Sequence, residues 1–321
     1  FDVIISPETD KEIVNAGLAS MTCETCFPVK ISHGHAAVLK DKCDFLFMPL
    51  MIEMSSDRKD FSFYCPYVES NTYMLKAALN LDSSKIMKPA VYINKGLKSI
   101  EKAFMSEFNR LRLGFDSDLF EKAYNKAVKA DNDFQEKIHR IGKEILKKLG
   151  DKPAIVVLGR PYSAYDSRTN LNLFSTFSRL GVYAIPQEFF DLSHYKIETE
   201  YTNMYWGFGN KILRCSKFIN ENKQLFGLYL TSFSCGPDSF ILHFYSTEPF
   251  FWKWRLHTAF VDQTLYSIHI ENRNAANRMY VLPLLKIMIN KNCAVVLDVI
   301  CLRRIWLQKN DFVKHSGVQF I

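Results

Sequence analysis

Residues 153–162 read PAIVVLGRPY, and this stretch decides the class of fold that the sequence predicts. Residues 154–158 form a continuous apolar run, which is typical of a strand buried on both faces of a parallel sheet. Gly159 marks the turn that follows this strand. The later residues continue the alternation, with a helix expected over 171–180 and further strands over 181–186 and within 223–233. Strands that alternate with helices favour a layered α/β unit.

A similar unit is expected upstream. Residues 3–5 are expected to form a strand, and a helix is expected to follow with Thr9 as N-cap, Glu12 as capping-box partner and Gly17 as its C-terminal stop. Two apolar runs, over 43–51 and 87–95, are expected to be strands of a parallel sheet.

The fold class predicted from this pattern is α/β, with two layered domains whose parallel sheets are joined by a helical connector. The predicted boundaries are 1–97 for the first domain and 151–245 for the second. Residues 98–150 form the connector, because apolar residues recur there at helical spacing and Gly150 is a candidate for its end. Residues 246–321 have no clean period of 2 or 3.6, so we interpret them as a divergent or frame-shifted segment.

The composition narrows the functional classes. The formal net charge of +7 is spread along the 321 residues, which suits an acidic ligand but does not indicate nucleic-acid binding. No run of 18 apolar residues is present, so no membrane span is predicted. Eight cysteines in a chain of this length, without a signal peptide, indicate a reducing cytoplasm. The opening FDVIIS is interpreted as the middle of a strand, so an upstream part is expected.

Three cysteines share a local pattern. Cys26, Cys65 and Cys235 each stand one or two residues before a proline, which is favoured at the first position of a helix. A helix N-terminus carries partial positive charge, so we expect lowered thiol pKa values and thiolates that bind metal. If each corner follows a strand, the three thiolates meet at one sheet edge. Three thiolates can hold a 4Fe–4S cluster and leave one iron open as a Lewis acid.

The alternative is that these cysteines only fill space. Free cysteines are often small buried hydrophobic residues, and this interpretation is preferred for four others, namely Cys43, Cys215, Cys293 and Cys301. Cys23 forms a C-x-x-C motif with Cys26, but the proline of a thioredoxin-type motif is missing between them, which disfavours a redox pair.

Five blocks carry a family resemblance: TCETCFPVKISHGHAAVLK (22–40), FYCPYVESNTYMLKAA (63–78), GRPYSAYDSRTNLNLF (159–174), MYWGFGNKIL (204–213) and LTSFSCGPDSF (230–240). Over about residues 1–245 the chain resembles the uncharacterised domain that accompanies activases of 2-hydroxyacyl-CoA dehydratases. It is also similar to the cluster-bearing dehydratase subunits and to double-cubane cluster proteins. The resemblance implies Rossmann-like domains around an iron–sulfur cluster, 4Fe–4S or a double-cubane relative, with Cys26, Cys65 and Cys235 as ligands.

The resemblance also implies partners. An ATP-hydrolysing activase, upstream in the same chain or on a separate chain, would deliver electrons to the cluster, while an acyl-CoA and a dimeric state are further candidates. If the protein is an enzyme, it is expected to be a dehydratase-like lyase or a cluster-dependent reductase, oxygen-sensitive and from an anaerobe. The alternative function is a non-catalytic scaffold that docks the activator to its target and has structural cysteines.

Five further residues are candidates for a pocket around the cysteines. Lys30 lies one helical turn after Cys26 and is placed to neutralise a negative cluster, with a solvated surface position as the alternative. His33 and His35 are expected either to shape the pocket or to bind a neighbouring loop. Arg160, with Tyr162 beside it, follows a strand end and is a candidate for a CoA phosphate or a reduced cluster. Asp238 is expected to cap the helix after Pro237.

Overall fold

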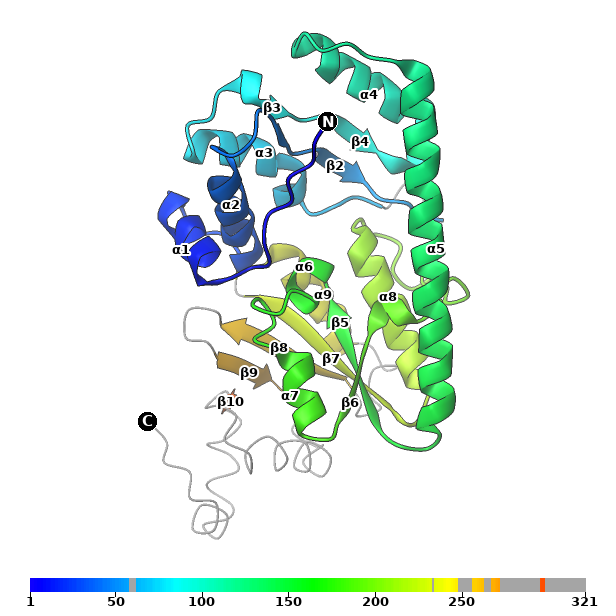
Figure 1. Ribbon diagram of the computed structural model, residues 1–321. Coiled ribbons are helices and arrows are strands. Elements are labelled where there is room, and N and C mark those ends of the chain that lie inside the picture. Colours follow the sequence, from blue (N-terminus) through cyan, green and yellow to red (C-terminus); the bar gives the residue numbers. More distant parts are fainter. Residues whose placement is uncertain (58–61, 233, 248–255, 263–266, 272–294, 298–321) are drawn as a thin grey trace.

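The computed structural model describes residues 1–57, 62–232, 234–247, 256–262, 267–271 and 295–297. Its largest sheet has six strands in the order β10-β9-β8-β7-β5-β6, and only the β8–β9 pair is antiparallel (Figure 1). The strands are β5 (Ala154–Gly159), β6 (Tyr183–Pro186), β7 (Leu225–Ser232), β8 (Leu256–Asp262), β9 (Ser267–Glu271) and β10 (Val295–Leu297).

The expectation that residues 154–158 form a strand buried on both faces is confirmed. All of β5 is buried, and its alternate residues enter two different clusters. Val156 and Leu158 pack with α8 (Gly207–Glu221), whereas Ile155 and Val157 pack with α7 (Leu173–Arg179). Because successive strand residues point to opposite faces, one apolar run supplies the core on both sides of the sheet.

In the first part of the chain the predicted strands are interrupted. Residues 43–51 give β1 (Leu46–Phe47) and the start of β2 (Leu50–Glu53), and the second run gives β3 (Ile86–Met87) and β4 (Ala90–Tyr92). Pro49 separates β1 from β2 and Pro89 separates β3 from β4, because proline has no N–H to donate to the ladder. β1 pairs with β3 and β2 with β4, both in parallel. The chain is therefore α/β with parallel sheets, while two Rossmann-like domains remain a prediction.

Three expectations about the N-terminal segment are wrong. Residues 3–5 form no strand and are exposed. Helix α1 (Lys11–Ser20) begins at Asp10, whose carboxylate accepts from the Ile13 N–H at 2.9 Å, whereas Thr9 bonds to other partners. Gly17 does not end α1.

Gly17 instead lets α1 approach α2 (Phe27–Leu39). A Cβ at Gly17 would overlap the main-chain oxygen of Lys30, and one at Gly34 would overlap that of Ile13. The two glycines thus bring the helix backbones together from both sides, and α2 is held in place by this contact.

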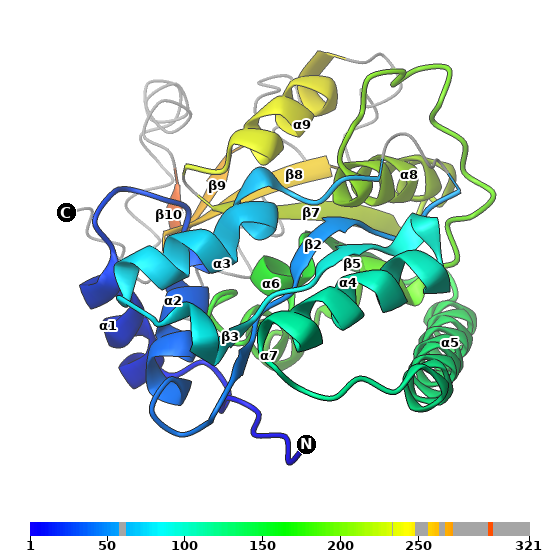
Figure 2. The ribbon, with the colours of Figure 1, turned by 90° about the horizontal axis from the view of Figure 1, so that it is seen from above.

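Two helices occupy the region predicted as a helical connector, α4 (Leu97–Arg110) and α5 (Ser117–Leu149). Gly150 ends α5 with φ +57°, as expected for a glycine C-cap. Helix α5 runs alongside both the small sheets and the six-stranded sheet, and Figure 2 looks down its axis. Gly142 contacts the main chain at Phe189, which fixes the helix beside β6. The domain boundaries themselves remain predictions.

The two α/β parts meet through main-chain and side-chain contacts. The Phe63 N–H donates to the Tyr205 oxygen, and the Gly207 N–H donates to the Phe63 oxygen, both at 3.0 Å. Asp57 pairs with Arg214 at 2.8 Å and with Lys196 at 3.2 Å. The first of these contacts lies two residues before Cys65, so it also fixes that corner against the second part.

Residues 246–321 were predicted to be divergent, and the described part of them extends the sheet. β8 pairs in parallel with β7 over six residues, and β9 and β10 follow it at the edge. Two apolar runs in this segment, over 281–289 and 293–302, are candidates for strands or a buried helix. The first run and most of the second lie outside the described residues. Among the described helices, none has both the length and the apolar character needed to cross a membrane.

Gly34→Ala is expected to lower the free energy of unfolding by about 1–3 kcal/mol, because its methyl group would overlap backbone that cannot move independently. Urea unfolding followed by circular dichroism measures the change. Gly114→Ala is the matched control, since a methyl group there meets nothing within 4 Å. Equal stability of the two variants would contradict the close contact between α1 and α2.

Candidate functional site

The three predicted cysteines all lie buried at helix N-termini. Cys26 is the N-cap of α2 and Cys65 is the N-cap of α3 (Pro66–Ala78), each followed by a proline in the first turn. Cys235 directly precedes α9 (Gly236–Thr247). Of the three, Cys235 lies three residues beyond a long strand, β7, whereas Cys65 lies two residues after an isolated bridge at Phe63 and Cys26 follows a bend at residues 22–23. Helix starts, rather than strand ends, are what the three positions share.

Electrostatic coupling places the three corners in one neighbourhood. The pKa of Cys26 responds to Cys65, Asp238 and Arg160. The pKa of Tyr162 responds to Arg160 first among charged groups, and also to Cys65 and Cys235. Since such coupling falls with distance, the helix starts that carry Cys26, Cys65 and Cys235 lie in one neighbourhood with α6 (Pro161–Ala164).

Burial has a larger effect than the helix N-terminus on the pKa of Cys26 and of Cys235. Burial raises the pKa of Cys26, and the main-chain N–H of Val29 at the helix N-terminus opposes it only in part. Burial also raises the pKa of Cys235 far above its ordinary value, and the neighbouring Asp238 carboxylate adds to the effect. The expectation of lowered pKa values is therefore wrong for Cys26 and Cys235, because desolvation of the thiolate outweighs the favourable dipole.

A buried ion pair lies beside the cysteines. Arg160 Nε donates to Asp238 Oδ1 at 2.7 Å, and Thr231 Oγ1 donates to Asp238 Oδ2 at 2.7 Å. The Arg160 side chain is 2% exposed and that of Asp238 is 4% exposed. The sequence suggested a helix-capping role for Asp238, but its carboxylate oxygens bind Arg160 and Thr231. This pairing was not predicted, because 78 residues separate Arg160 from Asp238 and no spacing rule connects them.

Arg160 keeps unused donors at this site. Within the described part of the chain, its two outer nitrogens, Nη1 and Nη2, are buried and have no hydrogen-bond partner. The Thr25 hydroxyl, next to Cys26, is likewise buried without a partner there. Tyr162 lies on α6, its ring packs edge-on against Phe208 at 6.3 Å between centroids, and burial raises its pKa. Arg160 and Tyr162 are electrostatically coupled to the cysteines, and their role in a pocket stays a prediction.

The other three predicted pocket residues have their contacts elsewhere. Lys30 Nζ pairs with the exposed Glu24 at 2.9 Å. His33 Nδ1 faces Ser20 Oγ of α1 at 3.4 Å, and His35 Nε2 lies 3.1 Å from Thr9 Oγ1. Thr9 in turn donates to Asp166 at 2.6 Å. Burial lowers the pKa of both histidines, which keeps them neutral, and the contact of His35 matches the predicted alternative of binding a neighbouring loop.

In the described ranges, no group of three or more His, Cys, Asp or Glu side chains is arranged to hold one metal ion. A cubane cluster makes a different demand, because each thiolate binds its own iron and the sulfurs stand further apart than ligands of one ion.

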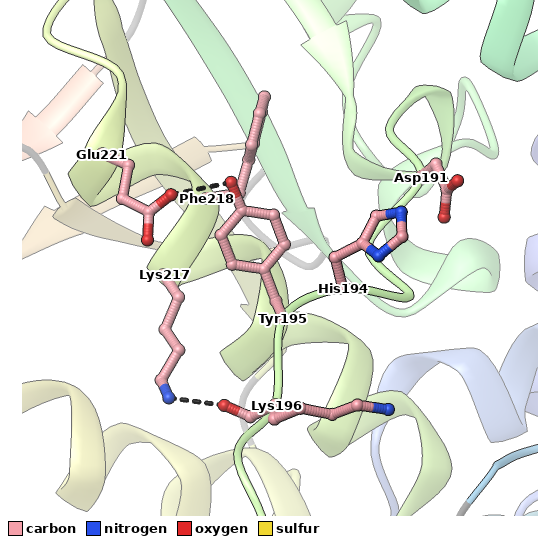
Figure 3. A pocket seen from close by; sticks show the side chains of 7 residues that line it. All are labelled: Asp191, His194, Tyr195, Lys196, Lys217, Phe218 and Glu221. Carbon is pink, nitrogen blue, oxygen red and sulfur yellow. Dashed lines mark hydrogen bonds between the residues drawn. The ribbon is translucent and has the colours of Figure 1, made fainter.

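A cavity of about 530 Å³ opens elsewhere on the protein, beside the C-terminal half of α8 (Figure 3). Two hydrogen bonds join residues of its lining: Tyr195 donates to Glu221 at 2.9 Å, and Lys217 donates to the Lys196 main-chain oxygen. The lining residues are Asp191, His194, Tyr195, Lys196, Lys217, Phe218 and Glu221. None of the cysteines or their predicted neighbours lines this cavity.

The fold and site define an α/β protein with three buried thiols around an arginine. The chain belongs to the family described as the CoA enzyme activase uncharacterised domain, which it matches over residues 1–190. No curated protein and no solved structure matches it. The matched segment contains Cys26, Cys65, Arg160 and Tyr162 and ends before Cys235.

The raised thiol pKa values predict a loss of stability at alkaline pH. Well below about pH 8.5, the ordinary pKa of a thiol, the thiols are protonated in both folded and unfolded chains, so the stabilisation is fully present. Above that pH the unfolded thiols ionise first, and each buried thiol lowers the free energy of unfolding by up to about 1.4 kcal/mol per pH unit.

Urea midpoints measured on the metal-free chain between about pH 7 and about pH 10 test this. Cys235→Ser removes one buried thiol, so its midpoint should fall less steeply with pH than that of the wild type. Cys23→Ser removes an exposed thiol and should keep the wild-type slope. A Cys235→Ser slope as steep as the wild type would show that this thiol is not held neutral by the fold.

Proposed function

We propose that the protein is an iron–sulfur cluster protein of the 2-hydroxyacyl-CoA dehydratase and activase system. Cys26, Cys65 and Cys235 hold the cluster, a 4Fe–4S or a double-cubane relative. The observation that carries the proposal is the gathering of three buried cysteines, each at the N-terminus of a different helix, around Arg160.

The residues present fit such a group. Three thiolates suffice for a cubane and leave one iron without a protein thiolate. Each of the three cysteines stands at a helix N-terminus, whose partial positive charge stabilises negative charge. The burial of all three thiols excludes water, and the charge of Arg160 favours an anion beside them. When bound, the cluster would supply electron storage and an open coordination position.

The chain's own residues have distinct tasks in this proposal. The cysteines release their protons and bind iron, which the raised pKa values of Cys26 and Cys235 make unfavourable unless metal is present. Asp238 holds the Arg160 guanidinium by its Nε, so the positive charge stays at a fixed place beside the sulfurs. Tyr162 and Phe208 add an aromatic wall.

Family membership supports the proposed partner. The family name links the domain to CoA enzyme activases, so we propose that an ATP-hydrolysing activase, on this chain or on another, passes electrons to the cluster. An acyl-CoA and a second copy of the chain are further proposed partners. If the site is catalytic, the reaction is that of a dehydratase-like lyase or a cluster-dependent reductase, in an anaerobe's cytoplasm. The proposed architecture is the Rossmann-like pair, 1–97 and 151–245.

A non-catalytic scaffold is the second candidate. The observation that favours it is that α5 has exposed apolar side chains, with Leu119 65% and Phe134 56% exposed. In this second proposal these side chains contact the activator. In that case the cysteines are structural, and α5 docks the activator.

Anaerobic purification followed by iron and sulfide analysis separates the two candidates. The wild-type chain is expected to be brown and to hold about four irons and four sulfides. Cys65→Ser should lose most of them, because a hydroxyl is a much poorer ligand for iron than a thiolate.

Two controls accompany this experiment. Cys23→Ser, at an exposed position, and Cys215→Ser, on the buried face of α8, should keep the wild-type iron content if they fold. A colourless wild-type chain that gains no iron on anaerobic reconstitution would exclude the cluster and leave the scaffold.

A further inference from the structure

The outer end of the Arg160 guanidinium is the least satisfied buried group beside the cysteines. Arginine carries five N–H donors, and only the one on Nε has a partner here, Asp238 Oδ1. The other four, on Nη1 and Nη2, are buried without an acceptor among the described residues. Leaving charged donors unpaired in the interior is costly, so an acceptor is expected in the working protein.

Asp238 does not accept from Nη1 or Nη2 in this arrangement. One of its oxygens already receives Arg160 Nε at 2.7 Å, and the other receives the Thr231 hydroxyl at 2.7 Å. In this arrangement the Nε side of the guanidinium faces Asp238. The fork formed by Nη1 and Nη2 is left for a different partner.

The surroundings of the fork favour an anion. Arg160 is close enough to Cys26, Cys235 and Tyr162 to act on the ionisation of each. The helices α2 and α9 both begin at cysteines of this group, so their positive N-termini are turned to it. The unpartnered Thr25 hydroxyl beside Cys26 adds one more donor.

We propose that Nη1 and Nη2 of Arg160 bind one compact anion at the cysteine site. A guanidinium fork recognises two acceptor atoms at once, so the anion must offer a pair of them. Because Arg160 is 2% exposed, the anion is small or wholly enclosed, which disfavours the solvated phosphates of CoA. Two sources supply this chemistry: the anionic cluster held by the cysteines, or a small free carboxylate. Only the first rests on the proposed function.

Arg160→Lys is the informative variant, because it keeps the positive charge but lacks the fork. In the first arm, cluster-loaded protein is challenged with an iron chelator, and iron release is followed by absorbance. If the cluster is the anion, release from Arg160→Lys should be roughly tenfold faster or more than from the wild type. In the second arm, the cluster-free chain is titrated with acetate by calorimetry. If a free carboxylate is the anion, its affinity should fall roughly tenfold or more in Arg160→Lys.

Matched variants keep the result interpretable. Arg110→Lys is the control, because Nε, Nη1 and Nη2 of Arg110 all have acceptors. It should match the wild type in both arms. If Arg160→Lys fails to fold, the double variant Arg160→Gln with Asp238→Asn removes both buried charges together and takes its place.

The outcomes are distinct from those of the iron analysis. A chain that never holds iron still tests the fork through the acetate titration. If the wild type and Arg160→Lys hold iron equally well and neither binds acetate, the protein has a cluster but the proposed anion site at Arg160 is overturned. Wild-type and Arg160→Lys proteins that agree in both arms would do the same.

Discussion

The ion pair between Arg160 and Asp238 is the contact on which the arrangement of the site depends. Arg160 follows β5 and Asp238 lies in the first turn of α9. The strands β5 and β7 are hydrogen-bonded neighbours, and Gly159 at the end of β5 pairs with Leu230, two residues before the end of β7. A buried pair of this kind adds little net stability, because both charges lose their hydration. Removing one partner, however, leaves the other uncompensated, so the pair fixes a geometry more than it stabilises the fold. It fixes the direction of the guanidinium and the start of α9, the helix that Cys235 directly precedes.

The predictability of the fold followed the strength of local signals. The run at 154–158 was read correctly as a doubly buried strand, because its pattern alone identifies both faces, and Gly150 was read correctly as a helix end. Pro49 and Pro89 each lie inside an apolar run that was expected to form one strand. Each proline divides its run into two short strands. Gly17 was misread because a glycine in a helix can mark either an end or a close approach, and only the facing helix distinguishes these.

The candidate site was predictable in its positions but not in its chemistry. The prolines after Cys26 and Cys65 identify helix starts from sequence alone, and the structure places both residues at N-caps. The pKa direction could not be obtained in this way, because burial depends on packing between distant segments and here exceeds the effect of the helix dipole. The Arg160–Asp238–Thr231 network was beyond sequence reasoning for the same reason, since its members meet only when β5 and β7 pair.

The site is shared between the two parts of the chain, and this has a consequence for stability. Cys26 and Cys65 come from the first part, whereas Arg160 and Cys235 come from the second. The main-chain bonds of Phe63 that join the parts lie two residues from Cys65. A ligand that binds cysteines of both parts binds only when those parts are docked, so it must stabilise their docking by the same free energy with which it binds. Conversely, the docking at Phe63 positions Cys65 in advance, which reduces the ordering that a ligand would otherwise have to impose.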